Sequence, residues 1–66
     1  MSKSIFHTII KASDEIYKGN LKLEKSLDAY ADGNDDGAAN QYDRALDHYD
    51  KALVLVDECG NAVVGA

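Results

Sequence analysis

The chain has 66 residues, a net charge of −5 at neutral pH, one cysteine and no proline. A chain this short leaves much of its surface exposed and usually needs a disulfide, a metal or a partner chain for stability. One cysteine excludes an intramolecular disulfide, and no apolar run approaches the roughly 20 residues of a membrane span. The N-terminal apolar run is too short for a signal peptide, so we expect a cytoplasmic protein.

An amphipathic helix is predicted over about residues 4–31. Its main apolar residues recur at helical spacing: Ile9, Ile16, Leu23, Leu27 and Tyr30. We expect Ile5, Phe6, Ile10 and Tyr17 to widen this stripe. The pair Gly19-Asn20 could end a helix, but the seven-residue spacing continues through it. One helix is therefore expected, with two shorter helices as the alternative.

The next segment, residues 32–37, reads Asp-Gly-Asn-Asp-Asp-Gly and is predicted to be an acidic turn. Its two glycines allow the chain to reverse, and Asp35 or Asp36 is expected to cap the following helix. Residues 24–47 hold seven acidic and two basic residues, a balance of −5 that equals the net charge of the whole chain.

A second helix is predicted over about residues 37–59. Its apolar residues are spaced by three and four positions: Ala39, Tyr42, Leu46, Tyr49, Leu53 and Val56. Gly60 suits the position just after a helix end. Residues 60–66 are therefore expected to form a frayed tail.

Small residues recur every seven positions in both predicted helices. The two rows are Ala12, Gly19, Ser26 and Gly33, and Ala38, Ala45, Ala52 and Cys59. When the two rows are paired in reverse order, the two residue numbers of every pair sum to 71. This pairing sets Ser26 against Ala45 and Ala12 against Cys59. Such rows allow close helix packing. They predict an all-α fold, an antiparallel two-helix hairpin with these residues at its contact.

With the small rows in contact, both apolar stripes fall on one side of the hairpin. We name this side the apolar face, and it comprises Ile9, Ile16, Leu23, Leu27, Tyr30, Tyr42, Leu46, Tyr49, Leu53 and Val56. Soluble monomers rarely expose so large an apolar patch. Two hairpins packed face to face would cover it as a four-helix bundle. A homodimer is therefore expected, with a different protein as the alternative cover.

The opposite side collects most of the basic residues. This basic face comprises Lys11, Lys18, Lys22, Lys25, Arg44 and Lys51. A dimeric hairpin of this outline resembles the Rop-type proteins, which implies RNA binding through an outer helical face as an alternative function. Glu15 and Glu58 share the face, and the net charge opposes attraction of nucleic acid.

The acidic turn also matches part of an EF-hand calcium loop. Asp32, Asn34, Asp36 and Asp43 occupy positions 1, 3, 5 and 12 of that motif. Position 12 is normally Glu, and a second loop is missing. A single calcium site is therefore an alternative, and the main expectation is that no cofactor is needed.

Neither histidine has partners at metal-ligand spacing, and no nucleophile and base stand out. We therefore expect a non-enzymatic protein–protein interaction or regulatory module. A further alternative is an acidic inhibitor that mimics nucleic acid through residues 24–47.

Overall fold

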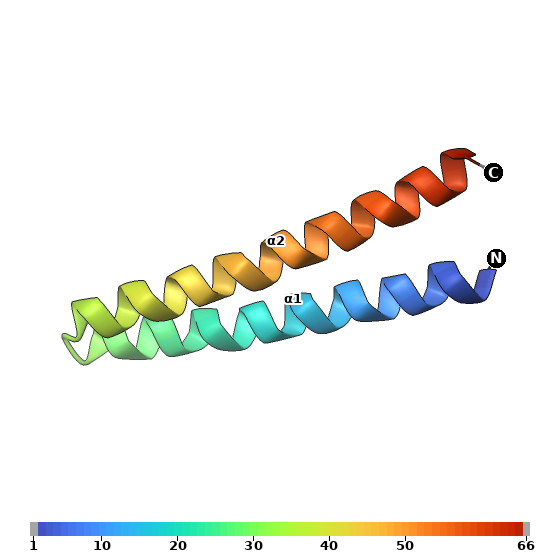
Figure 1. The fold of residues 1–66 in the computed structure, drawn as a ribbon. Coiled ribbons are helices and arrows are strands. Elements are labelled where there is room, and N and C mark those ends of the chain that lie inside the picture. The colour runs from blue at the N-terminus through green and yellow to red at the C-terminus, as the bar shows by residue number, and fades with distance from the viewer. Residues whose placement is uncertain (1, 66) are drawn as a thin grey trace.

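The computed structural model describes residues 2–65, with side chains described for residues 5–60. Two helices form the fold, α1 (Ser2–Ala31) and α2 (Asp35–Gly65). They lie side by side and antiparallel, so that α1 begins and α2 ends at the same end of the rod (Figure 1). The all-helical two-helix hairpin that the sequence predicted is therefore the observed fold.

The first helix is continuous. α1 passes through Gly19 and Asn20 without interruption and ends at Ala31, so the alternative of two shorter helices is wrong. Gly19 is buried in the helix contact. Gly19 does not end the helix. Because it has no side chain, it leaves space for a side chain of α2 that is described below.

The turn is shorter than predicted, because it contains only residues 32–34. Gly33 has a φ of 79°, which lies in the left-handed region that favours glycine. The Gly33 amide donates to the Tyr30 carbonyl at 3.0 Å, and the Asn34 amide donates to the Ala29 carbonyl at 2.8 Å. These two hydrogen bonds close α1 as a Schellman motif.

Asn34 caps the second helix, whereas Asp35 or Asp36 was predicted to do so. The Gly37 amide donates to the Asn34 side-chain oxygen at 2.9 Å, and the Ala38 amide donates to the Asn34 carbonyl at 2.9 Å. Both aspartates instead lie in the first turn of α2, where their charge is favourable to the helix dipole. Gly37 is helical and takes no part in the reversal.

α2 is also longer than predicted at its other end. It begins at Asp35 instead of residue 37 and continues to Gly65 instead of ending at residue 59. Gly60 therefore lies within the helix, and the expected frayed tail is helical as far as Gly65. Residue 66 lies outside the described residues.

Small side chains form the contact between the helices. The buried residues there are Ala12, Gly19, Ser26, Ala38, Ala45 and Ala52. Ala45 is completely inaccessible, at 0% exposure. No large apolar side chain is fully buried within the described part. The hairpin core is therefore thin, and the large apolar side chains lie on the flanks.

The register differs from the predicted one by one heptad. Ser26 Oγ donates to the Ala38 carbonyl at 2.7 Å, although Ala45 was its predicted partner. The half-buried Cys59 places its Sγ 3.9 Å from the Ile5 carbonyl, although Ala12 was its predicted partner. The short turn explains the shift, because it sets the end of α1 directly against the start of α2.

Candidate interaction surfaces

The apolar face is open along both helices. Eight of its ten side chains are exposed, from 42% for Ile16 and Leu46 to 70% for Tyr30. The other two, Leu23 and Tyr49, are half-buried. The structure therefore brings these residues together on one side but covers few of them.

The two stripes of the apolar face meet near the ends of the chain. There a shallow apolar groove of about 270 Å³ is lined by Ile9, Ala12, Ser13, Ile16, Val56 and Cys59. Its lining comes from both helices, so the face is one continuous surface there and not two separate stripes.

The apolar face is also free of charge along its length. On α1, the residues three, four and seven positions after Ile9, Ile16 and Leu23 are all uncharged: Ala12, Ser13, Ile16, Gly19, Asn20, Leu23, Ser26, Leu27 and Tyr30. The same steps on α2 from Tyr42 to Val56 reach Ala45, Leu46, Tyr49, Ala52 and Leu53. Acidic and basic side chains therefore begin only at the margins of this face.

Three residues of the basic face border a groove on the other side of the hairpin. The groove has a volume of about 610 Å³ and is lined by Lys11, Asp14, Glu15, Lys18, Asp50, Lys51, Val54 and Leu55. Three lysines and three acids line it, and Lys18 Nζ lies 3.2 Å from an Asp14 carboxylate oxygen. This half of the basic face is therefore electrically balanced.

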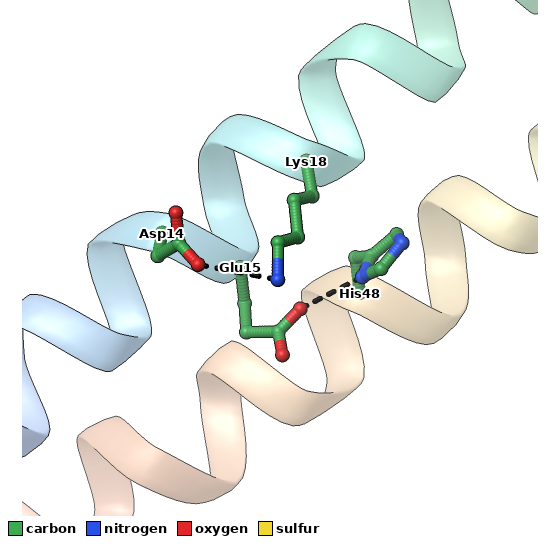
Figure 2. A network of polar contacts seen from close by, with 4 residues as sticks. All are labelled: Asp14, Glu15, Lys18 and His48. Carbon is green, nitrogen blue, oxygen red and sulfur yellow. Dashed lines mark hydrogen bonds and ion pairs between the residues drawn. The ribbon is translucent and has the colours of Figure 1, made fainter.

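A cross-helix hydrogen bond between Glu15 and His48 lies on the same side (Figure 2). The Nδ1 atom of His48 on α2 is 2.7 Å from Oε1 of Glu15 on α1, and both side chains are only about one-fifth exposed. Sequence reasoning assigned neither residue to this contact. The pair becomes visible only in the observed register, which brings their positions level.

The other half of the basic face is a cluster of positive charge. Lys22, Lys25 and Arg44 form no ion pair with an acid among the described side chains. The neighbouring charge of Lys25 lowers the pKa of Lys22, and desolvation and Arg44 lower it further. These three residues are close enough to repel one another.

The EF-hand motif does not form a calcium loop in this structure. The chain is helical from Asp35 onward, so Asp36 and Asp43 stand about 10 Å apart along the axis of α2. The Asn34 side chain is used as the helix cap. Among the described residues, no group of three or more His, Cys, Asp or Glu is placed to hold a metal ion.

A second apolar stripe lies on the outer side of α1. We name Phe6, Ile10, Tyr17 and Leu21 the outer stripe, and their exposures run from 41% to 65%. Three of them were expected to widen the apolar face. However, Ile10 and Tyr17 each follow a residue of that face, and one residue rotates the helix by about 100°. Ile10, Tyr17 and Leu21 therefore point away from α2, whereas Phe6, seven residues before Ser13 of the apolar groove, lies between the two surfaces.

Neither helix, over the described residues, contains an apolar stretch that could cross a membrane. Comparison of the chain with protein-family models, with curated proteins and with solved structures gave no match.

Proposed function

We propose that this chain is a protein–protein interaction module that acts as a homodimeric four-helix bundle joined through its apolar face. The observation that carries the proposal is the exposure of eight large apolar side chains on one side of the hairpin. A soluble monomer rarely leaves a continuous surface of this kind uncovered.

A second copy of the chain suits this face for two reasons. The centre of the face carries no Asp, Glu, Lys, Arg or His side chain, so two copies related by a two-fold axis meet without like-charge contacts there. When the dimer forms, burying the exposed half of one apolar side chain contributes about 1 kcal/mol to the free energy of association. Two chains together gain roughly 16 kcal/mol, which matches or exceeds the roughly 4–15 kcal/mol cost of association.

Light scattering during size-exclusion chromatography tests the dimer. The wild-type chain at micromolar concentration should have twice the chain mass of 7.2 kDa. Leu53→Asp, at a position 65% exposed on the apolar face, should shift the mass to that of one chain. Val54→Asp is the matched control, since Val54 is 60% exposed but lies outside this face. A monomeric wild type, or a dimeric Leu53→Asp variant, would contradict the proposal.

Cys59 supports a proposed cytoplasmic location. The free thiol is half-buried beside the Ile5 carbonyl and fills space at the helix contact. Oxidising compartments favour disulfide-paired cysteines, whereas reducing ones retain free thiols.

RNA binding through Lys22, Lys25 and Arg44 is a second candidate function, favoured by their lack of acidic partners in the described part. Phosphates would relieve the mutual repulsion of these cations. An electrophoretic shift with a structured RNA at low salt tests it, because low salt strengthens phosphate contacts. No shift under that condition would remove this candidate.

A further inference from the structure

The outer stripe of α1 stays exposed even in the proposed dimer. Phe6, Ile10 and Tyr17 are each more than 60% exposed. Ile10 lies about 160° around the helix from Ala12, the buried contact residue of the same turn. Neither α2 nor a second hairpin on the apolar face reaches this side. Its apolar residues therefore need a separate explanation.

The outer side of α1 changes from apolar to acidic residues toward the turn. The same steps of three and four residues that lead from Tyr17 to Leu21 continue to Glu24 and Asp28. Neither carboxylate forms an ion pair among the described side chains, and two acids four residues apart repel each other. The surface thus has an apolar part about 22 Å long, which Asp14 interrupts between Ile10 and Tyr17 with its charge paired to Lys18. It ends in two unpaired acids beside the acidic turn.

A second copy of the chain does not fit this surface. In a parallel pairing of two outer stripes, Glu24 and Asp28 of one copy would face the same acids of the other. In an antiparallel pairing, they would face the apolar side chains of Phe6 and Ile10 and lose part of their hydration. Both directions are unfavourable, in contrast to the uncharged apolar face.

We propose that the outer stripe is a docking site for one amphipathic helix of a different protein, with apolar residues along most of its contact and lysine or arginine at one end. Such a helix would cover Phe6, Ile10, Tyr17 and Leu21 with its apolar part. Its basic end would neutralise Glu24 and Asp28 and relieve their repulsion. A partner of about 22 residues spans the surface from Phe6 to Asp28.

Fluorescence anisotropy with synthetic helical peptides tests the site in the full-length chain. Two fluorescein-labelled 22-residue peptides carry leucines on one stripe and two lysines at its N-terminal or C-terminal end, to cover both directions. A third peptide has glutamates in place of the lysines. We expect one lysine peptide to bind, and the glutamate peptide to bind at least about tenfold more weakly. Equal binding of all three would overturn the charge assignment.

Matched variants locate the site. Ile10→Asp should weaken binding of the lysine peptide by about 10- to 100-fold, because an apolar contact is lost. Val54→Asp makes the same change at an equally exposed position on α2 and should leave binding unchanged. Glu24→Gln with Asp28→Asn should weaken binding and reduce its salt dependence. Asp43→Asn with Asp47→Asn, which alters the net charge equally, should not.

Three results would overturn the proposal. They are no binding of either lysine peptide, wild-type affinity in a folded Ile10→Asp variant, and self-association beyond a dimer that Ile10→Asp abolishes. Circular dichroism shows whether each variant is folded. The light-scattering result stays separate, because a monomeric wild type that binds the peptide through Ile10 refutes the homodimer and retains the docking site.

Discussion

The aromatic ring of Tyr49 on α2 lies against Gly19 in the middle of α1. A Cβ atom at Gly19 would come within 2.7 Å of Cε1 of Tyr49. The Tyr49 hydroxyl also donates a hydrogen bond to the Asn20 side chain. The glycine in the middle of α1 therefore serves the packing of a ring from α2.

This contact predicts that Gly19→Ala destabilises the hairpin. Alanine improves helix propensity by about 1 kcal/mol, but its methyl group forces the Tyr49 ring outward and breaks the hydrogen bond to Asn20. Crowding of this kind costs about 1–3 kcal/mol, so we expect a lower midpoint of thermal unfolding. Gly60→Ala is the control, because no atom lies within 4 Å of a Cβ there and only the gain in propensity remains. A Gly19→Ala variant stabilised as much as Gly60→Ala would contradict the packing role.

The cap of α2 gives a second prediction. Asn34→Ala removes the side-chain oxygen that accepts from the Gly37 amide and should lower the free energy of unfolding by about 1 kcal/mol. Asn34→Asp retains an acceptor and should keep most of the stability. Urea unfolding followed by circular dichroism measures both. Equal losses from the two substitutions would show that Asn34 contributes something other than capping.

The Glu15–His48 pair should couple the two helices energetically. A double-mutant cycle with Glu15→Ala and His48→Ala should give a coupling energy of about 0.5–1.5 kcal/mol, because the contact is short and largely covered. The same cycle for Asp14 and Lys18 should give at most about 0.5 kcal/mol, since that pair is exposed and within one helix. A coupling near zero for Glu15 and His48 would remove this pair as a helix-joining contact.

The lowered pKa of Lys22 predicts a pH-dependent effect. Because the folded-state pKa lies below the usual lysine pKa of 10.5, the protonated lysine destabilises the fold at neutral pH. This destabilisation disappears as the pH rises from the pKa of Lys22 in the folded chain to its pKa in the unfolded chain. Lys22→Gln should therefore raise the midpoint of thermal unfolding at pH 7, and less so near pH 10.5 or in high salt. Lys11→Gln makes the same charge change away from Lys25 and Arg44 and serves as control. A Lys22→Gln variant less stable than wild type at pH 7 would contradict the repulsion.

Local sequence patterns predicted the helices and their apolar flank. The recurrence of Ile9, Ile16 and Leu23 through Gly19 correctly indicated one continuous helix, because helical periodicity is local and survives a single glycine. The outer stripe was missed as a separate surface. Ile10 and Tyr17 are apolar and adjacent to residues of the apolar face, but adjacency in sequence is a rotation of about 100° on a helix.

The sequence by itself determined two amphipathic helices, a glycine-containing reversal between them and rows of small residues at their contact. Only the tertiary structure decided the register. Both rows repeat every seven residues, so a slip of one heptad again sets small residue against small residue, as Ser26 against Ala38 replaces Ser26 against Ala45. Hydrogen bonds of the turn select between these arrangements, because the αL conformation of Gly33 and the cap from Asn34 limit the connection to three residues. That choice also brings Glu15 to His48 and Tyr49 to Gly19.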